Sequence, residues 1–169
     1  MFPFLFRLAT RRLLIRRMHP DDWRDLYAYL SDPETVLYEP YDVYTKEDAM
    51  LEAANRANSP AFLAVCLQSN GKMIGNLYFA RNGEEAELGY VFHKKYRGRN
   101  YAFEACSAII AYAFKEPDLR SVYAECDARN LRSRHLMERL GMTFETEFSG
   151  PDFTGREEQA RSIRFRLVK

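Results

Sequence analysis

Two Asn-Gly pairs, Asn70-Gly71 and Asn82-Gly83, constrain the possible fold of this chain more than any other feature. They separate three apolar runs, AFLAVCLQ, KMIGNLYFAR and EAELGYVFH. Asn-Gly between apolar runs favours the tight turn of a β-hairpin, because both residues tolerate a positive φ. The three runs are therefore expected to form an antiparallel meander in the middle of the chain.

Helical patterns precede this meander. A first strand is expected over 12–18, after a short apolar extension, and a helix over 20–30 with Pro20 at its first position. A second helix should start after Thr45, which together with Asp48 resembles a capping box.

After the meander we expect a helix with an apolar face, then a strand at RSVYAEC and a helix at NLRSRHLMERLG. The chain should close with a final strand pair formed by TFETEF and QARSIRFRLV. The order βααβββαβαββ predicts an α/β fold, in the mixed α+β sense, as a single domain over residues 1–169. Its central mixed, mostly antiparallel sheet should have about seven strands, with about four helices on its two faces.

The composition excludes some classes of protein. With 25 basic and 24 acidic residues, the chain lacks the basic excess of a bulk nucleic-acid binder. No stretch approaches the roughly 20 apolar residues that span a membrane. The cysteines Cys66, Cys106 and Cys126 are odd in number and form no CxxC pair, which favours reduced thiols and a cytoplasmic protein. The histidines are scattered without metal-ligand spacing, so no metal site is expected.

The stretch HKKYRGRNYAFEACSAII places a basic turn that contains Gly98 directly before an amphipathic helix. The N–H groups and the dipole at a helix N-terminus bind phosphate, and glycine lets the backbone approach an anion closely. The stretch lacks the P-loop pattern GxxxxGK[ST] and the dinucleotide pattern GxGxxG. It is either a different kind of phosphate site or a solvated basic turn that only caps the helix.

Three segments carry a resemblance to a known family. ELGYVFHKKYRGRNYAFEA resembles the cofactor-binding segment of the GNAT superfamily of acyl-CoA-dependent N-acyltransferases, whose pattern [Q/R]xxGx[G/A] falls on Lys95–Asn100. Gly98 matches this pattern, whereas Lys95 and Asn100 depart from it. NLRSRHLMERLGM resembles the family's Nxx[S/A]xxxxxKxGF block, with Arg139 and Met142 as departures. RRLLIRRMHPDDWRDLYAYLSDPE resembles the opening of the ribosomal-protein N-terminal acetyltransferase (RimJ/RimL-like) branch, so the likeness covers roughly residues 10–148.

The resemblance implies a GNAT fold in which two parallel strands diverge and hold the pantetheine arm of acetyl-CoA between them. Main-chain groups of one strand would pair with the pantetheine amides as an added β-strand does. The diphosphate would lie on the amides of the basic turn, and Asn130 would contact the cofactor arm. The cofactor-binding residues expected on this basis are Tyr90, Val91, Phe92, Arg97, Gly98, Arg99, Asn100, Tyr101, Ala102, Asn130 and Ser133.

Acetyl transfer to an amine needs a proton acceptor, and Glu87 is the candidate, directly or through a water molecule. Glu87 could equally be a hairpin carboxylate that faces solvent, as its neighbours Glu84 and Glu85 could be, and Glu85 is the second candidate.

The departing thiolate needs a proton donor. Many family members use a tyrosine where this chain has Met137, but the ribosomal-protein branch uses a serine three residues after the helix-capping Asn, which matches Ser133. Local hydrogen bonding in the first helical turn is the alternative role of Ser133, and a helix cap is that of Asn130. Cys126 is interpreted as a small core residue rather than a catalytic one.

The connection between the first two helices is expected to build the acceptor site through Tyr38, Glu39 and Tyr41. Acidic and aromatic groups suit a cationic amine, either a protein or peptide N-terminus or a small-molecule amine; an ordinary surface loop is the alternative. The sequence therefore predicts a cytoplasmic acetyl-CoA-dependent N-acetyltransferase that binds neither nucleic acid nor membranes, with a homodimer plausible. A non-catalytic acyl-CoA-binding or sensing module on the same fold and an RNA-associated protein are the alternatives.

Overall fold

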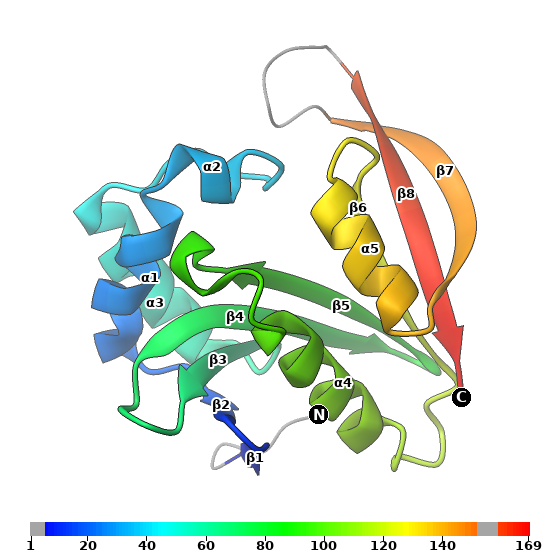
Figure 1. The fold of residues 1–169 in the computed structure, drawn as a ribbon, viewed down its shortest axis with the longest axis horizontal. Coiled ribbons are helices and arrows are strands. Elements are labelled where there is room, and N and C mark those ends of the chain that lie inside the picture. The colour runs from blue at the N-terminus through cyan, green and yellow to red at the C-terminus, as the bar shows by residue number, and fades with distance from the viewer. Residues whose placement is uncertain (1–5, 152–158) are drawn as a thin grey trace.

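The computed structural model describes residues 6–151 and 159–169 of the chain and confirms the expected mixed α/β fold. Within these residues, eight strands form one sheet in the order β1-β2-β3-β4-β5-β6-β8-β7, and five α-helices accompany it (Figure 1). The strands are β1 (Arg7–Ala9), β2 (Leu13–Arg17), β3 (Phe62–Leu67), β4 (Met73–Asn82), β5 (Glu85–Phe92), β6 (Ser121–Asp127), β7 (Thr143–Pro151) and β8 (Gln159–Val168). The helices are α1 (Trp23–Leu30), α2 (Pro33–Val36), α3 (Lys46–Asn58), α4 (Tyr101–Ala113) and α5 (Leu131–Arg139).

The meander predicted from the two Asn-Gly pairs is confirmed. Strands β3, β4 and β5 pair antiparallel in sequence order. Gly71 and Gly83 have φ values of +73° and +62° in the two turns. These values lie in the left-handed region, which glycine adopts without the steric cost that a Cβ brings.

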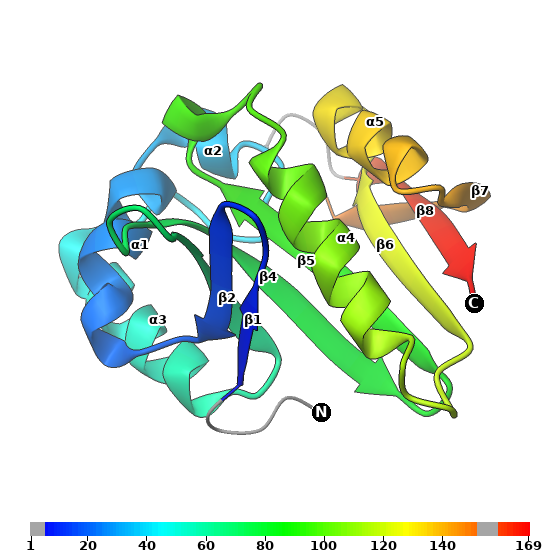
Figure 2. The ribbon, with the colours of Figure 1, turned by 60° about the horizontal axis from the view of Figure 1, so that its bottom comes forward.

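Two hydrophobic clusters lie on opposite faces of the sheet. Neighbouring residues of β3 alternate between them, because successive side chains of a strand point to opposite faces: Leu63 and Val65 join one cluster, and Ala64 and Cys66 join the other. The first cluster packs α4 and α5 against the sheet, and α4 crosses in front of the strands in Figure 2. The second cluster packs α1 and α3 against the other face, so helices cover both faces as predicted.

Two short elements were not predicted. Arg7–Ala9, expected only as part of an apolar extension, pairs with β2 as an edge strand, because its backbone can continue the ladder. Pro33–Val36, expected as part of an irregular connection, forms one helical turn. Pro33 at its first position and the bond from the Thr35 hydroxyl to an Asp32 carboxylate oxygen at 2.9 Å stabilise that turn.

The predicted ends of the longer helices are largely confirmed. Thr45 caps α3 in a capping box with Asp48, and Gly141 follows α5 with a φ of +82°. The first predicted helix begins instead as a 3-10 turn over Pro20–Asp22 before α1.

Strands β5 and β6 are the parallel neighbours in this otherwise antiparallel sheet, and they pair over a short stretch. Their register holds Glu85 opposite Ser121 and Glu87 opposite Tyr123, and the pairing ends there. Both strands continue, to Phe92 and Asp127, and their ribbons diverge in Figure 1. The edge of β5 beyond Glu87 therefore faces β6 without a ladder, although β4 pairs with its other edge as far as Phe92.

Candidate functional site

The basic turn before α4 has the backbone of an anion site. Gly98 and Asn100 both adopt the left-handed conformation, with φ values of +74° and +62°. Asn100 is the N-cap residue of α4 but its side chain makes no capping hydrogen bond. The first N–H groups of a 13-residue helix thus point out of the turn without a side-chain acceptor, which is the arrangement that binds phosphate.

The Asn100 side chain instead reaches α5. Its Oδ1 accepts a hydrogen bond from Arg139 Nη1 at 3.1 Å, and the Arg139 guanidinium lies 4.7 Å from the centre of the Phe103 ring. Asn therefore replaces the family's small residue without distorting the turn, since asparagine tolerates this conformation, and it ties the start of α4 to the end of α5.

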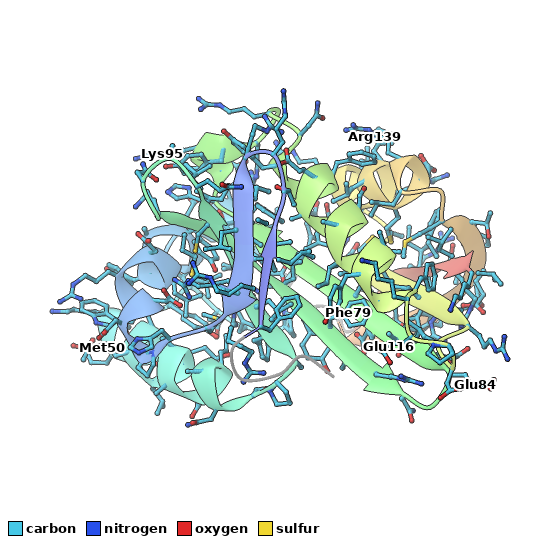
Figure 3. The ribbon with its side chains drawn as sticks, turned by 90° about the horizontal axis from the view of Figure 1, so that it is seen from below. Met50, Phe79, Glu84, Lys95, Glu116 and Arg139 are labelled. Carbon is cyan, nitrogen blue, oxygen red and sulfur yellow. The ribbon has the colours of Figure 1, made fainter. Side chains whose placement is uncertain are left out.

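Basic side chains surround the turn, and Glu34 of α2 pairs with two of the nearby arginines. Arg97 Nη1 lies 2.6 Å and Arg132 Nη1 3.1 Å from the same Glu34 oxygen, so Glu34 bridges the turn and α5. Lys95 and Arg99 are exposed beside them. Lys95 and Arg139 lie at the same end of the molecule in Figure 3, whereas Glu84 and Glu116 lie at the opposite end.

Ser133 and Tyr90 meet where β5 and β6 diverge. Asn130 caps α5 by accepting the Ser133 N–H at 3.2 Å, which fixes the buried serine in the first turn of the helix. The Ser133 and Tyr90 hydroxyl oxygens are 2.7 Å apart. Asn130 thus has the helix-capping role that was expected as an alternative. This cap positions Ser133, whose hydroxyl also contacts the Tyr90 hydroxyl.

Cys126 completes this group on the β6 side. Burial raises the pKa of its thiol to about 11, a hydrogen bond with Ser133 opposes that rise, and the nearby negative charge of Asp127 adds to it. A thiol with a raised pKa stays protonated at neutral pH and is a poor nucleophile. Met137 lies fully buried in the first cluster.

Glu87 lies three residues before Tyr90 on β5, so its side chain points to the opposite face of the strand. It is partly buried, and the Tyr123 hydroxyl donates to its Oε2 at 3.5 Å. Burial raises the pKa of Glu87, and the nearby Glu125 raises it further. Its neighbours differ: Glu84 is exposed and Glu85 forms an ion pair with Arg166. Glu87 therefore has a raised pKa and lies at the point where β5 and β6 diverge.

The predicted acceptor segment joins α2 to α3, and Tyr38, Glu39 and Tyr41 are all partly buried in it. The Tyr41 hydroxyl lies 3.5 Å from Glu39 Oε2, and its ring packs on Tyr44 at 5.2 Å between centres. Burial raises the pKa of Glu39 to about 7, although Tyr41 and Arg56 both lower it.

Arg56 of α3 organises this segment and was not among the residues predicted from the sequence. It is almost fully buried, its Nε lies 2.6 Å from Glu52 Oε1, and its Nη1 donates to Asn76 Oδ1 at 3.2 Å. Its guanidinium also lies 4.6 Å from the Phe62 ring centre and 5.9 Å from that of Tyr41. A buried arginine gives no periodic signal, so a single sequence offers no way to single it out among the exposed arginines.

Tyr90 was predicted to bind the cofactor through its main chain, and the structure adds a contact of its side-chain hydroxyl with Ser133. The remaining candidates lie close by: Val91 is buried in the second cluster, and Phe92 and Tyr101 pack on the first. Among the described residues no group of His, Cys, Asp and Glu side chains could hold a metal ion. The part of the chain that the structure describes also holds no helix long and apolar enough to cross a membrane.

Comparisons with known proteins agree with this geometry. Residues 12–143 match the family model "Acetyltransferase (GNAT) domain". The uncharacterized N-acetyltransferase YnaD of Bacillus subtilis (strain 168) is 36% identical over 144 residues, 83% of this chain and 85% of that protein. A [ribosomal protein uS5]-alanine N-acetyltransferase of Escherichia coli (strain K12) is 29% identical over 87% of this chain and 82% of its own. The crystal structure of a GNAT-family acetyltransferase from Bacillus anthracis superposes with a TM-score of 0.89 at 29% identity, covering 96% of this chain and 98% of that one.

Proposed function

The chain belongs to the acetyltransferase (GNAT) domain family and is an acetyl-CoA-dependent N-acetyltransferase, and we propose that it acetylates a primary amine held between Glu87 and the segment after α2. The proposed acceptor is the α-amine of a protein or peptide N-terminus, with a small cationic amine as the second possibility. Resemblance to the uS5-alanine enzyme and the two carboxylates Glu39 and Glu87 support this choice.

Acetyl-CoA fits two features of this chain. The uncapped start of α4, with left-handed Gly98 and Asn100, offers N–H groups to a diphosphate. The edge of β5 beyond Glu87 has no ladder with β6, so main-chain groups of Tyr90 to Phe92 are available for an amide-bearing arm. Acetyl-CoA supplies an activated acetyl group and a thiolate leaving group.

The chain's own residues would then move the protons. Glu87, whose raised pKa makes it a better base than an ordinary glutamate, accepts a proton from the attacking nitrogen, directly or through a water molecule. Ser133 donates its hydroxyl proton to the departing sulfur, and the Tyr90 hydroxyl, 2.7 Å away, is placed to replace that proton. The single observation that carries this proposal is that the Ser133–Tyr90 pair and Glu87 lie at the same divergence of β5 and β6.

The test has two stages. Thermal unfolding with and without acetyl-CoA should show an upward shift, since a ligand of the folded state alone stabilises it by about 2.7 kcal/mol at a hundredfold excess over Kd. Thiol release is then measured with peptides that start with Ala or Ser, the same peptides with blocked N-termini, and spermidine. Turnover of the free peptides, lost on blocking and in Glu87→Gln, supports the proposal; acetyl-CoA binding with no turnover of any amine contradicts it.

The alternative of a non-catalytic acyl-CoA-binding module is not favoured, because the relatives with a stated activity are acetyltransferases. A homodimer remains a proposal, which light scattering of the purified chain would decide.

A further inference from the structure

The segment between α2 and α3 is anchored by backbone bonds near both ends, and the first of these bonds is made by Glu39 itself. The Glu39 N–H donates to the Val36 carbonyl at 2.9 Å, and the Tyr44 N–H donates to the Leu30 carbonyl at 3.0 Å. In Figure 1 this segment, just after α2, extends toward α5 and the diverging ends of β5 and β6. Glu39 is therefore held in place by backbone bonds rather than carried on a free loop.

The charge of Glu39 acts on the groups at the divergence. It contributes to raising the pKa of the Tyr90 hydroxyl and of the Cys126 thiol, although burial is the larger cause for both. On its own segment the carboxylate contacts Tyr41, and the charge of Arg56 lies near enough to lower its pKa. The charge of Glu39 therefore reaches Tyr90 and Cys126, and the ion pair of Glu34 with Arg132 at 3.1 Å brings α2, which precedes this segment, beside α5.

Acetylation of a charged amine requires two protons to leave the nitrogen. The first must leave before attack, because an ammonium has no lone pair. The second leaves as the N–C bond forms and the C–S bond breaks. One proton is matched by the proton that the sulfur receives, and the other is released to water, so R–NH₃⁺ and the acetyl thioester give the amide, the free thiol and H⁺.

We propose that Glu39 binds the acceptor amine as an ammonium ion and accepts its first proton, leaving Glu87 to accept the second during attack. This inference rests on the proposed function and adds a second catalytic carboxylate to it. The ammonium lies between Glu39 and Tyr41 in this arrangement, and the neutral amine then faces the thioester at the divergence.

The proton affinity of Glu39 suits one class of acceptor. Its pKa of about 7 lies within about one unit of an α-amine, at roughly 7.7–8.0, but more than three below a lysine side chain, at about 10.4. Transfer of the first proton is therefore about 400-fold less favourable from a lysine than from an α-amine, by the ratio of those constants. The site should select N-terminal α-amines over the ε-amine of lysine.

The experiment compares the full chain with Glu39→Gln, Glu39→Asp and the control Glu47→Gln, an exposed glutamate in the first turn of α3. The probe is a lysine-free peptide with a free N-terminal alanine, and kcat/KM is measured from pH 6 to 9.5 by thiol release. Glu39→Gln should lose about 10-fold at pH 7, where roughly a tenth of an α-amine is neutral, and recover most of it above pH 9, where the amine arrives neutral. The kcat/KM of Glu39→Asp should lie between those of the wild type and Glu39→Gln, and the kcat/KM of Glu47→Gln should match that of the wild type.

A loss in Glu39→Gln that is equal at pH 7 and pH 9, or no loss, overturns the assignment of Glu39. Absence of turnover in the wild type, despite acetyl-CoA binding, instead contradicts the proposed acceptor class, so the two failures are distinguishable.

A second measurement does not depend on turnover. A carboxyl whose pKa is higher in the folded state than in the unfolded state holds its proton more tightly when folded, so it favours folding at low pH and opposes folding once ionised. The melting temperature of Glu39→Gln relative to wild type should therefore rise between about pH 4.3, the unfolded value of a glutamate, and pH 7, the folded value. A difference that does not change over this window removes the buried environment on which the proposal depends.

Discussion

Substitution of Gly98 by valine separates the two roles of the turn before α4, folding and anion binding. An ideal Cβ built on Gly98 meets no atom within 4 Å, so valine is not excluded by contacts inside the protein. Its φ of +74° nevertheless places a side chain in the left-handed region, which costs a non-glycine residue roughly 1–2 kcal/mol. The open space around that Cβ is the space a bound diphosphate would occupy.

Gly71 provides a matched control in the turn between β3 and β4. Its φ is +73°, and a Cβ there also meets nothing within 4 Å. Gly71→Val and Gly98→Val should therefore lose the same roughly 1–2 kcal/mol of unfolding free energy, while only Gly98→Val should lose acetyl-CoA binding.

Denaturant unfolding with acetyl-CoA at a hundred times the wild-type Kd measures both effects. The wild type and Gly71→Val should each gain about 2.7 kcal/mol from the ligand, whereas a hundredfold weaker Kd in Gly98→Val would leave a gain of only about 0.4 kcal/mol. Equal ligand-induced stabilisation of the two variants would refute the assignment of this turn to the diphosphate. Unequal stability losses without ligand would refute the strain argument.

Two further predictions concern the groups at the divergence and the polar contacts beneath the acceptor segment. Ser133→Ala should lower turnover by about 10²–10⁴-fold while calorimetry finds the affinity for acetyl-CoA nearly unchanged, and an unchanged kcat would remove its role as proton donor. Tyr29→Phe should cost about 1 kcal/mol in urea unfolding, because Asn76 Oδ1 loses the Tyr29 hydroxyl at 2.7 Å but keeps Arg56 Nη1 at 3.2 Å. Asn76→Ala should cost about 3 kcal/mol or more, because it leaves two buried donors without that acceptor; equal losses in the two variants would contradict this account.

Local sequence signals were enough to predict the longer elements and their order. The Asn-Gly turns, the Thr45 capping box and Gly141 act within a few residues, so a single sequence reveals them, and the structure confirms each. Elements of three or four residues, β1 and α2, were not predicted, because such short stretches hold too little periodic pattern to separate them from irregular chain.

The candidate site was only partly accessible from the sequence. The turn around Gly98 is contiguous, so residue types and a family pattern were enough to predict it as a candidate anion site. The contact of Ser133 with Tyr90 joins residues 43 apart and depends on how α5 packs on the sheet. The contact of Glu87 with Tyr123 joins residues 36 apart and depends on the register of β5 and β6.

The tertiary structure also decided how the environments of glutamates that look alike in the sequence differ in burial and in charged partners. Glu84, Glu85 and Glu87 are alike in sequence, yet burial beside β6 raises the pKa of Glu87, while Glu85 meets Arg166 from β8. Glu39 acquires its pKa of about 7 from burial on the segment between α2 and α3, whose backbone bonds to α2 and α1. Sequence thus determines the backbone elements, whose interactions are local, whereas proton affinities depend on solvent exclusion and on charges from distant strands, which exist only once the chain is folded.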